Sequence, residues 1–232
     1  MAEEPATAIP APVDDPYNRQ FLSLRGRVCA ALTKSVAWLL YNLYNRCSTT
    51  GAENVPKEGP VLLYANHLSL YDPPLVGTRI RRFIRYMAKR ELFGKDDKDN
   101  LFGHFLGGIG AFPVKRGGAD RAAMRRAMNY LDQGQGVLIF PEGTRGDGVT
   151  IREFTPGVAM LALSNPETTI VPVRIRGSEK ALPKGAAVPR PAKISVTIGK
   201  PFRVNDLQGL PAEKKSLYRA LADEMLSRLS AL

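Results

Sequence analysis

A histidine and an aspartate stand close together in the sequence, directly after a short apolar segment. Residues 61–65, Val-Leu-Leu-Tyr-Ala, have the composition of a buried strand and lead into Asn66-His-Leu-Ser-Leu-Tyr-Asp72. Positions five apart on a helix diverge by about 140° around its axis, so His67 and Asp72 can meet only if the residues between them form a turn. A carboxylate beside an imidazole orients the ring and stabilises its protonated form. This pairing predicts that His67 acts as a general base toward a hydroxyl group or water.

The same residues also fit a structural histidine beside a helix cap. Asp72 precedes Pro73, and aspartate followed by proline is typical of the N-cap and first position of a helix. We therefore expect a helix to begin at Pro73, and these residues alone leave capping and catalysis equally open. The chain contains no Gly-x-Ser-x-Gly segment, so if His67 is a base, the nucleophile is expected to belong to the substrate.

A glycine-rich segment with one acidic and one basic side chain, Phe140-Pro-Glu-Gly-Thr-Arg-Gly146, follows another apolar run. Glycines permit tight turns that leave backbone amides free to face an anion, and Arg145 offers a bidentate fork for phosphate. Glu142 suits a hydrogen bond to a substrate hydroxyl or a salt bridge that orients an arginine. A glycine-rich turn with solvated charges is the alternative interpretation.

Basic residues also follow or lie within two further predicted strands. Lys115 and Arg116 come after residues 111–114 and precede a helix expected to begin near residue 119 or 120, whose N-terminus favours anions. Arg174 and Arg176 alternate with apolar residues after Pro172, so they share one face of a strand. They are either surface charges or ligand contacts.

The elements that must position these side chains alternate between short apolar runs and helical patterns. We expect strands at 61–65, 83–88, 111–114, 137–140, 170–175 and 193–198, and helices at 73–80, 101–106, 119–133, 157–163 and 211–232. The strands are continuously apolar, which is typical of a sheet covered on both faces. We therefore predict an α/β fold, with a mostly parallel central sheet covered by helices, in a single domain at residues 48–232.

The preceding residues divide into an acidic tail and a helix. Residues 1–16 contain four acidic residues, four prolines and no basic residue, lack the order of a signal peptide, and are expected to be a disordered tail. Residues 17–47 predict either one amphipathic helix or a helix pair divided at Gly26. Such a helix either packs on the domain or lies in a membrane surface, and one helix can do both with different faces. No uncharged stretch reaches the ~20 apolar residues of a membrane span.

Composition narrows the classes of partner. The 232 residues carry a net charge of +11, from 33 Lys and Arg against 22 Asp and Glu. A chain so basic predicts an anionic partner: nucleic acid, an anionic membrane or a phosphorylated substrate. The sequence has no nucleic-acid-binding motif, no Walker motif and no complete dinucleotide fingerprint, and we expect no nucleic acid partner. Two cysteines and two histidines argue against disulfides and a metal cluster, so we expect a reduced, cytosol-facing protein without a metal.

Four segments, in this order, resemble the sequence blocks of the glycerolipid acyltransferase family, whose best-known members are 1-acylglycerol-3-phosphate acyltransferases. The block His-x4-Asp is matched by residues 67–72, and a strand that ends in Phe and then Arg is matched by residues 110–116. The block Phe-Pro-Glu-Gly-Thr-Arg is matched residue for residue at 140–145, and Val-Pro-Val at 171–173. The resemblance covers about residues 54–202, and the third block is its most specific part.

The resemblance implies an acyl transfer in which His67, oriented by Asp72, takes a proton from the free hydroxyl of a lysophospholipid or glycerol phosphate. The resulting oxygen attacks an acyl thioester carried by coenzyme A or acyl carrier protein, and no cofactor is bound. The developing negative charge on the thioester carbonyl needs donors, and the candidates are backbone amides near Gly143 or an oxyanion or acyl-donor region at Pro172, Val173 and Arg174. The substrate-binding residues that the resemblance implies are Lys115, Arg116, Glu142, Gly143, Thr144 and Arg145.

We therefore expect an enzyme that converts lysophosphatidic acid into phosphatidic acid on the cytoplasmic side of a membrane, as a peripheral or monotopic protein in contact with anionic lipid. Acylation of glycerol 3-phosphate, or of another lysophospholipid or lipid-linked acceptor, is the alternative reaction. From a different class, the alternative is a non-catalytic module that binds lipid phosphates at membranes. Such a module would need neither His67 nor Asp72.

Overall fold

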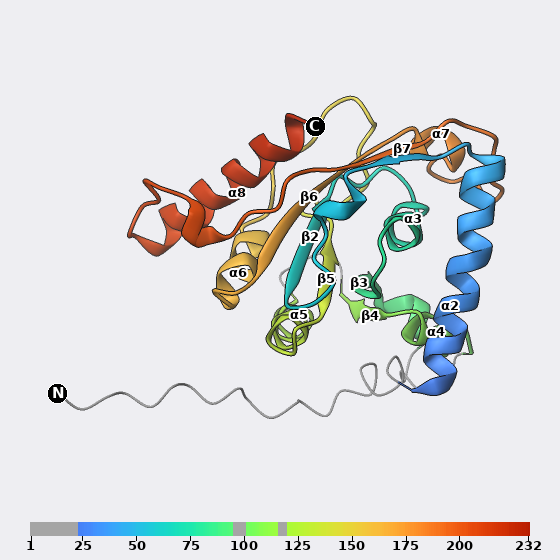
Figure 1. Cartoon of the computed structure of the whole chain (residues 1–232), viewed down its shortest axis with the longest axis horizontal. Coiled ribbons are helices and arrows are strands. Elements are labelled where there is room, and N and C mark those ends of the chain that lie inside the picture. The colour runs from blue at the N-terminus through green and yellow to red at the C-terminus, as the bar shows by residue number, and fades with distance from the viewer. Residues whose placement is uncertain (1–22, 95–100, 116–119) are drawn as a thin grey trace.

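The computed structural model describes residues 23–94, 101–115 and 120–232 of the chain. The predicted acidic tail, residues 1–16, and Arg116 lie outside the described residues. Seven strands form one sheet in the order β1-β7-β6-β2-β5-β3-β4 (Figure 1). Their bounds are Ser48–Thr50 (β1), Val61–Ala65 (β2), Ile84–Lys89 (β3), Ala111–Val114 (β4), Gly136–Ile139 (β5), Thr169–Arg176 (β6) and Ser195–Ile198 (β7).

The centre of the sheet is parallel. Strand β2 pairs in parallel with β5 on one side and with β6 on the other, and β5, β3 and β4 continue the parallel order. Strand β7 is antiparallel to β6, and the short strand β1 pairs in parallel with β7. The predicted fold class, a mostly parallel sheet within one α/β domain, is confirmed.

Helices cover both faces of this sheet, which explains why its central strands are apolar throughout (Figure 1). On one side lie α2 (Leu24–Leu39), α3 (Asp72–Arg79) and α4 (Leu101–Gly108). On the other side lie α5 (Arg121–Asp132), α6 (Gly157–Ser164) and α8 (Lys214–Ser230). The remaining helical segments are a π-helical turn, η1 (Leu40–Tyr44), three short 3₁₀ turns, η2 (Ala52–Asn54), η3 (Arg90–Phe93) and η4 (Val204–Asp206), and the four-residue α7 (Ser178–Ala181).

All six predicted strands are present, each with ends within two residues of the prediction, and all five helices predicted after residue 60 are present as well. The sequence did not predict β1, the short helix α7, the strand order or the antiparallel direction of β7. The sequence Ser48-Thr-Thr contains no apolar run, and only its middle residue is partly buried, so β1 gives no hydrophobic signal.

Of the two forms predicted for the N-terminal segment, the structure shows no division at Gly26, because α2 runs through this residue without interruption. Gly26 is buried, and a Cβ atom added to Gly108 of α4 would lie 3.7 Å from its Cα. The two glycines therefore let α2 and α4 approach closely, and this packing offsets the helix-propensity cost of about 1 kcal/mol that glycine carries. Among the described residues, no helix is both long and apolar enough to span a membrane.

Candidate active site

The carboxyl ends of β2, β5 and β6 meet at one edge of the sheet, because these three strands are neighbours and run parallel. His67 follows β2 by two residues, and Glu142 follows β5 by three. This edge of an α/β sheet is the usual position of a binding site. Strand order thus brings together two motifs that are 75 residues apart in the sequence.

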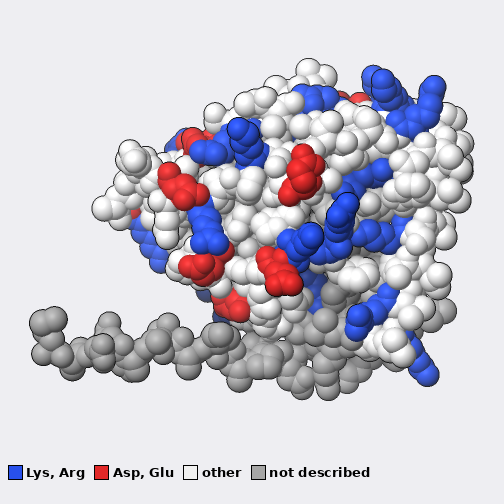
Figure 2. Space-filling model, in the orientation of Figure 1, with Lys and Arg blue, Asp and Glu red and all other residues white. Residues whose placement is uncertain are grey.

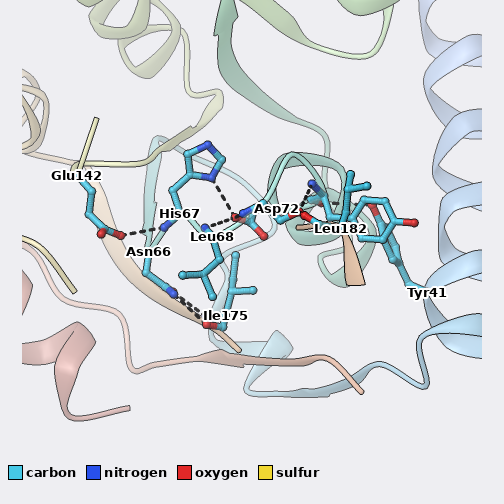
Figure 3. A network of polar contacts seen from close by, with 10 residues as sticks. Tyr41, Asn66, His67, Leu68, Asp72, Glu142, Ile175 and Leu182 are labelled. Carbon is cyan, nitrogen blue, oxygen red and sulfur yellow. Dashed lines mark hydrogen bonds and ion pairs between the residues drawn. The ribbon is translucent and has the colours of Figure 1, made fainter. Parts of the chain in front are cut away.

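Asp72 joins the histidine through a compact turn, residues 67–72, which we call the His67–Asp72 turn. Its Oδ2 atom lies 2.9 Å from His67 Nδ1 and accepts hydrogen bonds from the amides of Leu68, at 2.6 Å, and Ser69, at 2.7 Å (Figure 3). Asp72 has no exposed surface, and its other oxygen, Oδ1, has no partner within the described part of the chain. Three donors on one buried oxygen hold the carboxylate in a single orientation.

The prediction that Asp72 caps a helix was wrong. Helix α3 begins at Asp72 itself, and the carboxylate faces back into the turn. The two residues that follow are Pro73 and Pro74, which have no N–H group to offer a cap, and the amide of Leu75 donates to the carbonyl of Tyr71 at 2.9 Å. The turn before the helix is therefore where Asp72 finds its donors.

The imidazole of His67 is fixed on two sides. Its Nδ1 faces Asp72, and its ring stacks on Phe140 at a centroid distance of 4.3 Å and an interplanar angle of 29°. The residue is 7% exposed, so an edge of it reaches solvent. Because Asp72 accepts only from a protonated Nδ1, the arrangement leaves Nε2 of the neutral ring with its lone pair available to a substrate proton.

Glu142 ties the glycine-rich loop to the histidine. Its Oε1 accepts a hydrogen bond from the His67 amide at 2.9 Å (Figure 3). Its Oε2 accepts one from the Arg152 amide at 3.2 Å. The amide of Gly146 donates to the carbonyl of His67 at 2.6 Å, so the loop holds both backbone groups of this residue. Glu142 is 8% exposed, and within the described residues it accepts from backbone amides rather than from the arginine that the sequence suggested as one of its partners.

The loop from residue 143 to residue 152 brings positive charge and free backbone amides beside His67. Among the described residues, the amides of Thr144 and Arg145 donate to no other group, whereas the amide of Gly143 donates to the Phe140 carbonyl at 3.1 Å. Gly143 has a φ of 68°, a left-handed conformation that favours glycine. Arg145 is partly exposed, and Arg152 Nη1 donates to Thr144 Oγ1 at 2.9 Å.

Arg152 was not among the predicted site residues. It belongs to none of the four sequence blocks, and nothing in its spacing marks it, because it is placed by the contact of its amide with Glu142. Asn66 was also missed. Its side chain donates to the Ile175 carbonyl at 2.8 Å and accepts from the Ile175 amide at 2.7 Å, which joins the end of β2 to β6 (Figure 3). A side-chain amide directly before the histidine was the one available signal, since asparagine can replace a backbone partner.

Lys115 lies at a distance from this group. It follows β4, the edge strand, and β4 is three strand positions away from β2, which corresponds to about 14 Å. Its amide donates to Asp120 Oδ2 at 2.8 Å, and its side chain is exposed. The structure therefore does not bring Lys115 beside His67, and its neighbour Arg116 lies outside the described residues.

The three residues of the predicted oxyanion region on β6 differ in whether they can offer a donor to a ligand. Pro172 has no N–H group, and Val173 is buried between β2 and β7, so neither turns an amide toward the edge of the sheet. Arg174 is half-buried, and its Nε has no partner within the described residues. Burial lowers the pKa of the Arg174 guanidinium, the nearby charge of Arg176 lowers it further, and Glu142 acts in the opposite direction.

No group of three or more His, Cys, Asp or Glu side chains in the described ranges is arranged to hold a metal ion. The chemistry that the edge can support is acid–base catalysis at His67 Nε2. Anion binding is available beside it, at the Thr144 and Arg145 amides and the two arginines of the loop.

Comparisons with known proteins agree with this geometry. A family model described as Acyltransferase matches residues 46–176, which is more than half of the chain and confirms the resemblance carried by the four sequence blocks. A 1-acyl-sn-glycerol-3-phosphate acyltransferase of Bacillus subtilis is 27% identical over 182 residues, which span 78% of this chain and 84% of the relative. A lyso-ornithine lipid O-acyltransferase of Pseudomonas aeruginosa is 30% identical over 129 residues, covering 55% of this chain and 47% of the relative.

A solved structure shares the fold. The crystal structure of the 1-acyl-sn-glycerophosphate (LPA) acyltransferase PlsC from Thermotoga maritima superimposes with a TM-score of 0.68 at 24% sequence identity. The match covers 93% of this chain and 86% of the other.

Proposed function

Because the chain belongs to the acyltransferase family, we propose that it transfers an acyl group from a thioester to the free hydroxyl of lysophosphatidic acid, giving phosphatidic acid. The observation that carries the proposal is the 2.9 Å contact between His67 Nδ1 and Asp72 Oδ2, next to the loop that bears Arg145. The relative from Bacillus subtilis, whose name states this acceptor, supports the choice of substrate.

In the proposed reaction, His67 Nε2 takes the proton of the acceptor hydroxyl while that oxygen attacks the carbonyl carbon of the thioester. The new C–O bond forms, the tetrahedral intermediate collapses, and the C–S bond breaks. The departing thiolate takes the proton back from the imidazolium. Asp72 keeps the other ring proton on Nδ1 and stabilises the imidazolium in between. The thioester is already activated, so no covalent acyl-enzyme is required.

The proposed anion-binding group is the loop beside His67. The guanidinium groups of Arg145 and Arg152 and the unpaired amides of Thr144 and Arg145 suit the phosphate of the acceptor. One of these amides also suits the negative charge that develops on the thioester oxygen. Lys115, about 14 Å from the end of β2, suits a more distant anionic group, such as the phosphates of coenzyme A. We propose that Arg116, the next residue in the chain, also takes part in binding substrate.

We place the protein on the cytoplasmic side of a membrane, as a peripheral or monotopic protein. The support comes from α2 and η1, whose large apolar side chains point outward at helical spacing and are exposed: Leu24, Val28, Leu32, Val36, Leu39 and Leu43. Basic side chains predominate over the part of the surface that carries α2 and α3 (Figure 2), where Arg25, Arg27 and Arg81 are exposed. An apolar stripe flanked by basic residues suits the surface of an anionic membrane.

A second acceptor class has its own support. The relative from Pseudomonas aeruginosa is named for a lyso-ornithine lipid, which is a lipid-linked acceptor rather than a glycerophosphate. The same base and the same loop can serve any acceptor that presents a free hydroxyl near an anionic group. Glycerol 3-phosphate remains the simplest such acceptor, and either coenzyme A or acyl carrier protein is a suitable thiol carrier.

The experiment that tests the proposal is release of free thiol from an acyl thioester by the purified full chain, with products identified by mass spectrometry. Lysophosphatidic acid, glycerol 3-phosphate and a lyso-ornithine lipid are offered separately, each with acyl-coenzyme A and with acyl carrier protein. We expect the highest kcat/KM with lysophosphatidic acid. A clear preference for either other acceptor would replace the proposed substrate, and binding of lipid phosphate without any thiol release would indicate the non-catalytic module.

A further inference from the structure

The last turn of the N-terminal helix differs from the rest of it. Helix α2 passes into the π-helical segment η1, Leu40–Tyr44, and π-helical turns are found frequently at functional sites. Tyr41 is 2% exposed, whereas its neighbours Leu40 and Leu43 are exposed. One short segment thus presents apolar side chains outward and a single aromatic side chain inward.

Tyr41 contacts the His67–Asp72 turn directly. Its hydroxyl donates to the Tyr71 carbonyl at 3.2 Å, and its ring meets the Tyr71 ring edge-on at a centroid distance of 5.2 Å (Figure 3). Tyr71 immediately precedes Asp72, and its carbonyl also accepts the amide of Leu75, so this oxygen joins the turn to α3. Burial, followed by the nearby Tyr71 and Asp72, raises the pKa of the Tyr41 phenol, which therefore stays a hydrogen-bond donor.

Two more contacts make the junction rigid. Arg79 Nη1 of α3 donates to Asn42 Oδ1 at 3.0 Å, and the same guanidinium lies over the Tyr41 ring at 5.9 Å. On the other side of the turn, Ser69 Oγ donates to the Leu182 carbonyl at 2.8 Å (Figure 3). The residues that present Asp72 to His67 are therefore held between the N-terminal helix and the segment after α7.

We infer that Tyr41 is a positioning residue. It couples the binding of helix α2 to a lipid surface with the geometry of the His67–Asp72 pair. The inference rests on the proposed function. The outward side chains of η1 bind lipid, the inward side chain holds the Tyr71 carbonyl, and both belong to one five-residue segment. Lipid that restrains this segment stabilises the arrangement in which Asp72 faces His67, so turnover rises when α2 is seated.

The test compares Tyr41→Phe with Tyr44→Phe. Tyr44 is a matched control, because its hydroxyl lies in the same π-helical segment and also donates to a backbone carbonyl at 3.2 Å, but that carbonyl belongs to Pro189 and not to the turn. Each variant keeps its ring and loses one hydrogen bond. Turnover is measured with a short-chain, water-soluble lysophosphatidic acid, with and without vesicles that contain anionic lipid.

We expect vesicles to raise the kcat of the wild-type protein and of Tyr44→Phe, and Tyr41→Phe to lose about threefold to tenfold of that kcat, as expected for one hydrogen bond. The KM for the thioester and the melting temperature should match those of the control. Equal kcat values in the two variants would overturn the inference, and so would a wild-type protein whose kcat does not respond to vesicles.

A spectroscopic signature separates this inference from the proposed function. The chain has only two histidines, so the imidazole resonances of His67 can be assigned by comparison with His67→Ala. In the presence of lipid nanodiscs, we expect the Nδ1–H resonance of His67 to sharpen in the wild type and in Tyr44→Phe, but not in Tyr41→Phe. An identical response in all three proteins would contradict the coupling even if acyl transfer is confirmed. A selective response would support it even if the acceptor proves to be a different one.

Discussion

The two carboxylate side chains of the site are held mainly by hydrogen bonds from backbone amides. Asp72 is oriented toward His67 by the amides of Leu68 and Ser69, and Glu142 receives the amides of His67 and Arg152. Each carboxylate therefore fixes the main chain on both sides of the imidazole. A general base gains from such rigidity because the proton must travel along one defined direction.

Replacing Glu142 with Gln should damage both stability and turnover. The variant side chain keeps one acceptor oxygen, but its NH₂ group would face the second backbone N–H donor, so one buried amide loses its partner. We expect the free energy of unfolding to fall by about 1–3 kcal/mol, measured by urea titration, and kcat to fall with it.

The matched control is Glu153→Gln, which removes the same charge from an exposed position on the same loop. We expect it to leave both quantities near their wild-type values. If Glu142→Gln unfolds like the wild type and changes only the KM for the acceptor, the side chain contacts substrate instead of positioning His67.

The spacing of His67 and Asp72 excludes a contact along a helix, so from the sequence the two could meet only across a turn, and the family resemblance was needed to favour that pairing. It was not sufficient to predict the partners of Glu142, since these come from a loop and a strand that are distant in the chain. Arg152 is placed only by that contact and left no trace in any motif. Asn66 could have been proposed from its position directly before His67.

Helix α2 has two apolar faces that differ in the size of their side chains. Gly26 and Ala30 face the domain and are buried, while larger aliphatic side chains face outward. Small residues allow close packing against α3 and α4, and the large ones remain available for lipid. The two interpretations of this helix, packing on the domain and lying in a membrane, thus apply to opposite faces.

Replacing Leu32 and Val36 together with Gln should weaken binding to anionic vesicles. These side chains are 63% and 70% exposed, so the change should shift the free energy of unfolding by no more than about 0.5 kcal/mol. Each substitution removes about 1 kcal/mol or more of the free energy gained by burying the side chain in lipid. The double variant should therefore bind vesicles at least about tenfold more weakly in a sedimentation assay. Val149→Gln, at an exposed valine outside the helix, should bind normally; unchanged binding by the double variant would make the outward face irrelevant to lipid.

Among the elements, the strands were predictable because β2, β4 and β5 consist of apolar residues throughout, and β6 contains an apolar run at residues 170–173. Strand β1 was not, because three polar residues at an edge give no hydrophobic pattern. The start of α3 was misplaced at Pro73 because a proline after aspartate is also compatible with a helix whose first residue is that aspartate.

In the whole molecule, the site residues are brought together by the order of the strands in the sheet and not by their order in the sequence. Strand β2 lies between β5 and β6, so Asn66 reaches Ile175, 109 residues away, and His67 reaches Glu142. A covered parallel sheet was predictable from the alternation of elements, but its strand order was not, because continuous apolar strands fit several neighbours equally well. The same order places Lys115 at the far edge and Glu142 beside His67.

The central claim is that His67 removes the proton of the acceptor hydroxyl, and the most direct measurement is thiol release by His67→Ala. The purified variant is compared with the wild-type protein at saturating acyl-coenzyme A and lysophosphatidic acid, after its unfolding midpoint has been shown to be unchanged. We expect kcat to fall by about 10²- to 10⁴-fold, the usual contribution of a general base. A folded His67→Ala variant that releases thiol at close to the wild-type rate would contradict it.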